Sequence, residues 1–472
     1  MRLDSRNNVS YVAYSLLLAS CLLLLLGCYS KKKKQPKVEV DLPRIMDRGE
    51  ITAVTLYSSV SYFQYRSEPM GYEYDLIKSF AESKGLKLNI KVAENVTRLV
   101  DMLQAGEADV VAYPIALDNK LKKEVIYCGR EEISSQVLVQ RISKNVKLLT
   151  DVSELIDKDV YVKHDTKYHT RLKNLDTELG GGIHIHDIEK DTITTEDLIE
   201  MVSAGTIPYT FSDDKIARLN KTYYWNIDVS LPVSFPQRSS WVVRKSSPQL
   251  AEAINTWATD NASDPIFEAT IKRYFELSKK IMELSMPEIR QGNISPYDSL
   301  FKEYAKVLGW DWKLLASVSY QESHFKNHEV SWAGAKGLMG VMPGTANYLG
   351  ISIEELLDPE INIRTGVEVL KRFSRGFENV PDSLERIKFT LASYNAGLGH
   401  IQDAQRLAEK YGKDPFLWDD NTAEYTRLKR DPQYYNDPVV KHGYLRGTET
   451  FNYVREILGR YEYYKEKSKE LL

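Results

Sequence analysis

The hydrophobic positions between residues 44 and 278 follow two alternating patterns. Short apolar runs typical of β-strands alternate with segments whose apolar residues recur every three or four positions, as on one face of a helix. Strands separated by helices indicate an α/β fold with mainly parallel sheets, and the repetition of this unit predicts two lobes around a cleft. The predicted strands are ITAVTLY (51–57), LKLNIKV (86–92), DVVAYPI (109–115), KDVYVKH (158–164), IPYTF (207–211) and SSWVVRK (239–245). The predicted helices are YEYDLIKSFAESKG (72–85), TRLVDMLQAG (97–106), TTEDLIEMVSAG (194–205), DDKIARLN (213–220) and SPQLAEAINTWATD (247–260).

From residue 298 onward the strand patterns nearly vanish and helical spacing dominates. The preceding segment contains Pro287, Gly292 and Pro296 and has no strong period, so we place a domain boundary there. We therefore predict a second domain that is compact and mainly α-helical. Its predicted helices are 298–308, 311–325, 343–349, 361–377, 384–394, 401–411 and 451–464.

One acidic residue interrupts the apolar face of a predicted helix. In 311–325 that face contains Leu315, Val318 and Phe325, and Glu322 stands where the spacing calls for an apolar side chain. A carboxyl group among apolar neighbours has a raised pKa because burial disfavours its charged form, and a general acid needs this near neutral pH. From the pattern alone, an acid at the edge of the face or paired with an arginine is the alternative.

The N-terminus has the pattern of an export signal. Arg2 and Arg6 precede an apolar run at 11–26. The following LLGC resembles the lipobox of bacterial lipoproteins, which implies cleavage before Cys28, a lipid on its thiol and an anchor in the outer membrane facing the periplasm. An uncleaved membrane anchor is the alternative. The predicted organisation is a signal peptide (1–27), a tether (28–43), an α/β domain (44–278), a linker (279–297) and a helical domain (298–472).

Charge and cysteine content narrow the choice of function. The net charge of −3 argues against a dedicated nucleic-acid-binding protein. Cys21 lies in the predicted signal peptide and Cys28 is the predicted lipid site, so Cys128 is left alone and we expect it to be a buried apolar residue without a disulfide. His324 and His328 form an i, i+4 pair with no third ligand at a known spacing, so we predict no metal and no cofactor.

The α/β domain carries a resemblance. The segments MGYEYDLIKSFAESKGLKLNI, LVDMLQAGEADVVAYPI and VIYCG resemble the bacterial extracellular solute-binding proteins of the amino-acid type. This implies a two-lobe periplasmic-binding-protein-like fold that closes on a muropeptide or an amino-acid-like ligand. The segment 116–125 has lysines where the family has an arginine that holds the ligand carboxylate, and lysine lacks the bidentate fork. Asp213 matches the family aspartate that binds the ligand amine; a helix N-cap is the alternative.

The helical domain carries a second resemblance. The pair Glu322–Ser323, the glycine-rich SWAGAKGLMGVMPGTA (331–346), SYNAG (393–397) and a late tyrosine resemble, in this order, the lytic transglycosylase domain, a relative of goose-type lysozyme. The resemblance implies that Glu322 is the single catalytic acid/base. Gly340 stands where many members have glutamine, which implies altered contacts with the glycan. The implied substrate-binding residues are Ser323, Ser331, Met339, Tyr394, Asn395 and Tyr453.

A solute-binding domain followed by this domain on a lipoprotein is similar to the membrane-bound lytic transglycosylases. The resemblance implies cleavage of the β-1,4 bond between N-acetylmuramic acid and N-acetylglucosamine in peptidoglycan strands, with a 1,6-anhydro product, gated by a cell-wall fragment bound to the first domain. A muramidase-type hydrolase is an alternative, and it needs a second carboxylate, for which Glu329 and Glu449 are available. The other alternative is a non-catalytic receptor for glycan or solute.

Overall fold

The computed structural model describes residues 40–470, apart from 145, 190–192, 262–264 and 278–292. The predicted signal peptide, the predicted lipid site Cys28 and the tether up to residue 39 therefore lie outside the described residues. The last residues of the predicted tether belong to the fold: the Val40 carbonyl accepts a hydrogen bond from Ser247, and the Asp41 carboxylate caps the first described helix.

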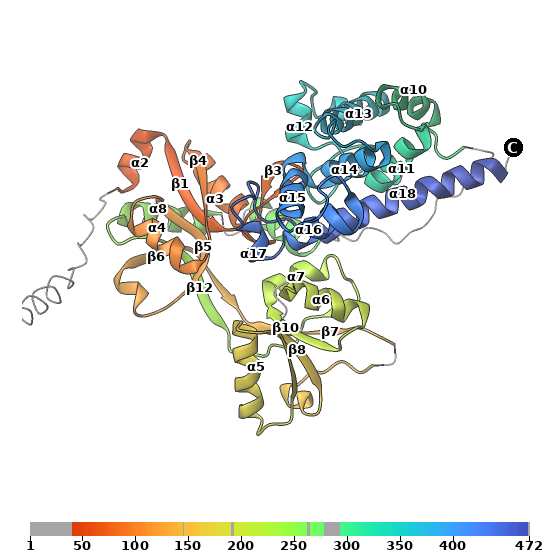
Figure 1. The fold of residues 1–472 in the computed structure, drawn as a ribbon. Coiled ribbons are helices and arrows are strands. Elements are labelled where there is room, and N and C mark those ends of the chain that lie inside the picture. The colour runs from red at the N-terminus through yellow and green to blue at the C-terminus, as the bar shows by residue number, and fades with distance from the viewer. Residues whose placement is uncertain (1–39, 145, 190–192, 262–264, 278–292, 471–472) are drawn as a thin grey trace, which may run out of the picture. The chain divides into compact units, whose positions relative to one another are not determined.

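The first lobe of the N-terminal domain surrounds a five-stranded sheet (Figure 1). Its elements are α2 (Leu42–Arg48), β1 (Glu50–Leu56), β2 (Phe63–Tyr65), β3 (Glu68–Met70), α3 (Tyr72–Ser83), β4 (Lys87–Ala93), α4 (Val96–Gln104), β5 (Val110–Ala116), β6 (Val125–Ser134), β12 (Gln237–Arg244), α8 (Pro248–Asp260) and α9 (Pro265–Phe275). The strand order is β4-β1-β5-β12-β6, with β1 parallel to β4 and β5. β12 is antiparallel to both of its neighbours.

The second lobe has its own five-stranded sheet. Its elements are β7 (Gln136–Arg141), β8 (Asp159–Lys163), α5 (Lys167–Glu178), β9 (His184–Ile188), α6 (Thr195–Ala204), β10 (Tyr209–Asp213), α7 (Asp214–Lys221) and β11 (Ile227–Asp228). The order is β11-β7-β10-β8-β9; β8 is parallel to β9 and β10, whereas β7 is antiparallel to β10 and β11. The predicted α/β fold with two lobes is confirmed, but each sheet is mixed because the chain passes from one lobe to the other and back.

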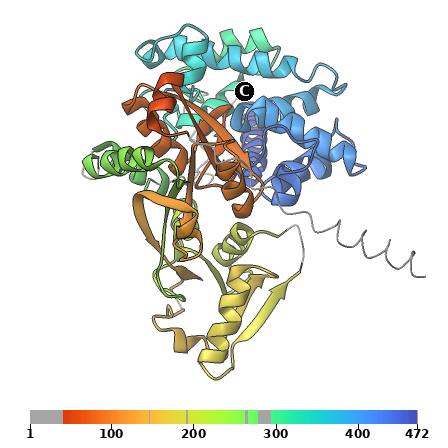
Figure 2. The same cartoon turned by 90° about the vertical axis from the view of Figure 1, so that its left-hand side faces the viewer.

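The C-terminal domain is helical, as predicted (Figure 2). Its helices are α10 (Asp298–Leu308), α11 (Trp312–Ser323), α12 (Pro343–Tyr348), α13 (Pro359–Arg375), α14 (Ser383–Ala396), α15 (Leu398–Lys410), α16 (Ala423–Leu428), α17 (Pro432–Tyr435) and α18 (Gly447–Glu470). Local signals set several of the ends: Gly309 ends α10 in the left-handed conformation with φ of 67°, and Asp311 caps α11. α11 packs against α10 and α18, which places its C-terminal end beside the glycine-rich segment.

Cys128 in β6 is a free, buried cysteine with 2% of its surface exposed. Desolvation raises the pKa of its thiol to about 12, so the thiol stays protonated and inert at neutral pH. The prediction of a buried apolar residue is confirmed.

Candidate functional site

Glu322 lies on the last turn of α11. The helix was predicted to continue to Phe325, but it ends at Ser323 because His324 and Phe325 both have left-handed backbones, with φ of 54° and 62°. The Glu322 side chain is only 5% exposed. The predicted burial of this carboxylate therefore does not depend on a regular helix to Phe325, which instead packs against Tyr320.

The burial of α11 is broader than the predicted apolar face. Ser317 and Ser319, on other sides of the helix, are fully buried, and their hydroxyls donate to the carbonyls of Ile457 and Leu338. The helix therefore runs through the middle of the domain. Serine is tolerated there because its hydroxyl finds a backbone acceptor.

Two side chains hold the Glu322 carboxylate. The hydroxyl of Tyr453 on α18 donates to Oε1 over 2.6 Å. Burial, and then the negative charge of Glu322, raise the pKa of Tyr453 well above its usual value, so its hydroxyl remains a donor. The second partner is Arg66 of the N-terminal domain, whose Nη2 lies 3.1 Å from Oε1 and 2.9 Å from Oε2. Pairing with an arginine was the alternative that the sequence pattern left open, and it is present beside the tyrosine.

Arg66 reaches Glu322 from the tip of a hairpin. Strands β2 and β3 are joined by the two-residue turn Arg66–Ser67, in which both residues have positive φ, 51° and 67°. Two-residue hairpin turns with positive φ at both positions normally contain glycine or asparagine, and other residues cost roughly 1–2 kcal/mol each in this conformation. Strain of this kind is found at functional sites. Here it directs a cation at a buried carboxylate.

Further contacts fix the hairpin on the C-terminal domain. Arg66 Nη1 donates to the Gly340 carbonyl over 2.8 Å, and the Glu68 carboxylate accepts the backbone N–H of Gly344, also over 2.8 Å. The guanidinium lies 5.8 Å from the ring centre of Tyr394. Burial alone would lower the pKa of Arg66, but the Glu322 carboxylate and the neighbouring tyrosines together outweigh burial and hold the pKa well above its usual value. Arg66 is therefore a permanent cation on the acid and fills the space next to it.

Gly340 is in direct contact with this ion pair. Its φ is 58°, and a Cβ atom at this position would collide with Oε2 of Glu322. The glutamine that many family members have here is therefore incompatible with this position of the Glu322 carboxylate. Besides its predicted effect on glycan contacts, Gly340 leaves space for the ion pair between Arg66 and Glu322.

Three of the predicted substrate-binding residues lie in the glycine-rich segment or bond its backbone. The Ser323 hydroxyl is buried, 3.1 Å from the Ser319 carbonyl and 2.9 Å from the Leu338 carbonyl. Met339 is fully buried, and Ser331 accepts a hydrogen bond from the N–H of Ala335. In this conformation the Ser323 hydroxyl bonds backbone carbonyls, and its contact with substrate stays a prediction. Met339 is likewise a core residue in this conformation.

Tyr394 and Asn395 lie at the end of α14, close to the hairpin. The Tyr394 hydroxyl donates to the Met339 carbonyl over 2.8 Å, so it orients the glycine-rich segment rather than Glu322 itself. Asn395 accepts a hydrogen bond from Thr450 and lines a small cavity at the hairpin. Tyr394 thus acts on the acid through the backbone of the neighbouring segment, and the binding of substrate by Tyr394 and Asn395 stays a prediction.

Asp213 lines a second site, a cleft of about 200 Å³ between the two lobes. Its Oδ2 lies 2.5 Å from Lys167 Nζ and 3.2 Å from the Tyr168 hydroxyl. Asp213 stands at the N-terminus of α7, but its side chain makes no capping hydrogen bond. The N-cap alternative is therefore not what the side chain does. Instead, Asp213 faces the cleft and is paired with a lysine.

An arginine also lines this cleft, although the segment 116–125 contains none. Arg238 on β12 is among the lining residues, and none of the lysines of 116–125 is. Arg238 and Arg66 were both missed by sequence reasoning. The available signal was weak in each case: an arginine in a strand that crosses between lobes, and a two-residue gap between two short apolar runs.

His324 and His328 do not share a helix face, because α11 ends before His324. In the part of the chain that the structure describes, another group brings possible metal ligands together: His164, His169 and Asp187 in the second lobe, with one ligand atom of each within 4.8 Å of the others.

Known protein families cover both domains. The model for bacterial extracellular solute-binding proteins, family 3, matches residues 52–277, and the model for the transglycosylase SLT domain matches residues 299–417. Among solved structures, the L-cystine solute receptor of Neisseria gonorrhoeae is 17% identical, with a TM-score of 0.42, and the match covers 50% of this chain and 96% of that one. The substrate-binding domain 2 of GlnP from Lactococcus lactis is also 17% identical, with a TM-score of 0.41, covering 52% and 98%.

Curated relatives match both domains together. A protein from Desulfosudis oleivorans named membrane-bound lytic murein transglycosylase F is 32% identical over 427 residues, which cover 90% of this chain and 92% of the relative. A protein of the same name from Pseudomonas fluorescens is 29% identical, covering 93% and 88%. The chain therefore belongs to the membrane-bound lytic murein transglycosylase F family.

Proposed function

We propose that this protein is a lytic murein transglycosylase, a carbon–oxygen lyase that cleaves the β-1,4 bond between N-acetylmuramic acid and N-acetylglucosamine. The observation that carries the proposal is the buried Glu322 carboxylate, held by Tyr453 within the motif order of the transglycosylase domain. A buried carboxyl group beside a hydroxyl donor is suited to exchange a proton with a bound sugar.

In the proposed reaction, Glu322 carries both proton transfers. Protonated Glu322 gives its proton to the glycosidic oxygen, and the N-acetylglucosamine product leaves. The substrate's N-acetyl group stabilises the positive charge that develops at C1. The C6 hydroxyl of the muramic acid then bonds to C1 and returns its proton to Glu322, which yields the 1,6-anhydro ring without water. Tyr453 keeps the carboxylate oriented through both steps.

A muramidase-type hydrolase is the competing proposal, favoured by one observation. Glu449 on α18 lies near the same hairpin: its carboxylate and that of Glu322 both act on the pKa of Tyr65, which burial raises well above its usual value. A hydrolase uses a second carboxylate to activate water or to stabilise the sugar cation. Glu329, the other acid available, is on an exposed loop.

Product analysis separates these proposals. Purified peptidoglycan is digested with the full-length Arg66→Ala variant, and the fragments are analysed by mass spectrometry. We expect 1,6-anhydro ends, lighter by one water than reducing ends. Reducing ends that incorporate oxygen from ¹⁸O-labelled water would refute the lyase in favour of the hydrolase. The wild type is digested in parallel, and glycan binding with no fragments of either kind from either protein would point to the receptor.

We further propose that the N-terminal domain gates this activity. The C-terminal domain contacts both lobes. Arg66 of the first lobe contacts Glu322. In the second lobe, Lys163 Nζ lies 3.2 Å from Asp431 of the C-terminal domain, and Asn220 accepts a hydrogen bond from Arg446 of that domain over 2.9 Å. A ligand that draws the lobes together in the cleft changes the distance between these two sets of contacts, so they cannot all persist. A muropeptide or amino-acid-like ligand would thereby withdraw Arg66 from Glu322.

The anchor is proposed from the sequence. The relatives are named membrane-bound, and no helix among the described residues is long and apolar enough to span a membrane. We propose that lipid on Cys28 holds the protein at the outer membrane, facing the periplasm. Replacing Cys28 by alanine is expected to move the protein from the membrane pellet to the soluble or precursor fraction after cell breakage. An unchanged, fully processed membrane-bound protein would contradict lipidation.

A further inference from the structure

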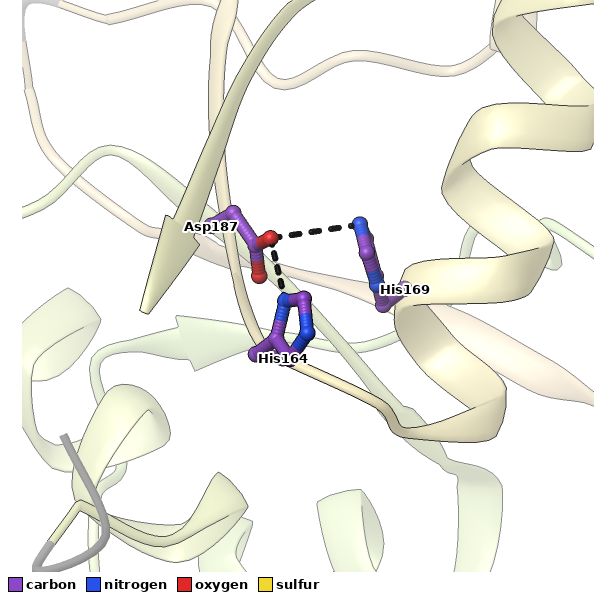
Figure 3. Close-up of side chains that lie close together, drawn as sticks. All are labelled: His164, His169 and Asp187. Atoms are coloured by element: carbon purple, nitrogen blue, oxygen red, sulfur yellow. Dashed lines mark hydrogen bonds and ion pairs between the residues drawn. The ribbon is translucent and has the colours of Figure 1, made fainter. Parts of the chain in front are cut away.

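Histidines are concentrated in one part of the second lobe. The chain has eight histidines, and four of them, at 164, 169, 184 and 186, lie within the unit formed by β8, α5 and β9. His164 follows β8, His169 is on the first turns of α5, and Asp187 is on β9. The three side chains converge (Figure 3), and one ligand atom from each lies within 4.8 Å of the others.

The spacing of the three groups is close to that of metal ligands. Asp187 Oδ2 lies 2.6 Å from His164 Nδ1 and 3.5 Å from His169 Nε2. Ligands at the usual zinc distances of about 2.0–2.2 Å stand roughly 3.3 Å apart around a tetrahedral ion. One of these distances is already near that value. The other requires His164, whose side chain is 44% exposed, to move by less than about 1 Å.

His169 is the most informative member of the group. Its side chain is only 7% exposed, and its Nε2 is buried without a hydrogen-bond partner. Buried polar atoms are normally hydrogen-bonded, so an imidazole nitrogen whose contact with the Asp187 carboxylate, at 3.5 Å, is too long for a good hydrogen bond needs an explanation. Figure 3 shows this nitrogen and a ring nitrogen of His164 both facing the carboxylate of Asp187.

The surroundings of the three possible ligands are also typical of a metal site. The other nitrogen of His164, Nε2, lies 3.5 Å from the carboxylate of Asp165. Metal-bound histidines commonly have their second ring nitrogen facing a carboxylate in this way. The scaffold is firm, because β8 and β9 are paired along their whole length, from Asp159 and His184 to Lys163 and Ile188.

We propose that His164, His169 and Asp187 bind one divalent transition-metal ion of the zinc type, with water completing the coordination. Two imidazoles and one carboxylate are donors that such ions prefer over Mg²⁺ or Ca²⁺, which take oxygen ligands. This site differs from the helical i, i+4 histidine pair, from which the sequence predicted no metal. These ligands come from three successive elements and are brought together by the fold.

His164 of the proposed metal site lies in the β8–α5 loop, between two lysines that make ion pairs. Lys163, before His164, pairs with Asp431 of the C-terminal domain, and Lys167, after it, pairs with Asp213 in the cleft. A bound ion restrains the loop between these two lysines. The ion is therefore structural in this proposal and remote from Glu322.

The test measures Zn²⁺ binding to the full-length protein, purified in detergent and freed of metal with a chelator. Isothermal titration calorimetry is expected to give one ion per chain. His164→Ala and Asp187→Asn are expected to weaken binding at least roughly tenfold, since even outer-shell partners have effects of this size. Co²⁺ should give a visible absorption band in the wild type that the variants lack, and Mg²⁺ in excess should not compete.

Two control variants define the site. His328→Ala removes an exposed histidine of the C-terminal domain, and His186→Ala removes the neighbouring histidine that pairs with Asp159. Both should bind Zn²⁺ like the wild type. Absence of binding in the wild type, equal binding in His164→Ala and Asp187→Asn, or loss of binding in His186→Ala alone would overturn the proposal. His164 is partly exposed, so its variant stays informative even if substitution of Asp187 disturbs folding.

Discussion

Replacing Glu322 by glutamine will lower the rate of peptidoglycan turnover roughly 10²–10⁴-fold, the range that a positioned acid or base contributes. Glutamine preserves the shape of the side chain and can still accept the hydrogen bond from Tyr453. It has no proton to give to the glycosidic oxygen. Turnover is measured as soluble muropeptides released from purified sacculi, with Arg66→Ala as the background so that substrate access does not limit the rate.

Glu329→Gln is the matched control. It makes the same chemical change seven residues further on, at an exposed loop position, and should leave turnover unchanged. If Glu322→Gln turns over peptidoglycan within a few-fold of its parent, Glu322 does not have the central role. If Glu449→Gln is as damaging as Glu322→Gln, the two-carboxylate hydrolase becomes the better description.

The second large effect is expected from Arg66→Ala, which should raise turnover by the full-length protein by roughly 5–150-fold, the range of coupling between sites in regulated proteins. A general acid must carry a proton and be accessible to substrate. The ion pair requires the carboxylate form of Glu322, and the guanidinium fills the adjacent space. Alanine removes both obstacles and leaves the Tyr453 contact intact.

Arg66→Lys is the informative companion variant. It keeps the positive charge but cannot contact Glu322 and the Gly340 carbonyl with the same fork, so intermediate turnover is expected. A muropeptide that acts by withdrawing Arg66 should stimulate the wild type and have little effect on Arg66→Ala. Lower turnover in Arg66→Ala, with the protein still folded by circular dichroism, would mean that Arg66 assists catalysis instead of blocking it.

Much of the fold follows from local patterns. Helix α10 starts and ends where its apolar spacing and Gly309 predict, and β1 and α6 lie within one or two residues of their predicted bounds. The hairpin β2–β3 was not predicted, because its turn is Arg66–Ser67 and lacks the glycine or asparagine that is typical of such turns. Only the contacts across the domains make that conformation tolerable.

The site was predictable where local sequence motifs identify its residues. Ordered motifs identified Glu322 and Tyr453, and these two side chains meet. The direction of a side chain was not predictable from a motif: Ser323 follows the acid in sequence, but its hydroxyl bonds the Leu338 carbonyl. Arg66 is 256 residues away from Glu322 in the chain, and no local pattern connects positions at such a separation.

The contact between Arg66 and Glu322 has a consequence for the cleft of the N-terminal domain as well as for the acid. Coupling between two binding sites is reciprocal. If a ligand in the cleft favours release of Arg66, then a glycan strand bound at Glu322, which competes for the same place, must tighten the cleft's hold on that ligand. The ligand would then dissociate more slowly from a protein at work on the wall than from an idle one, so activation would persist where substrate is plentiful and fade where it has been consumed.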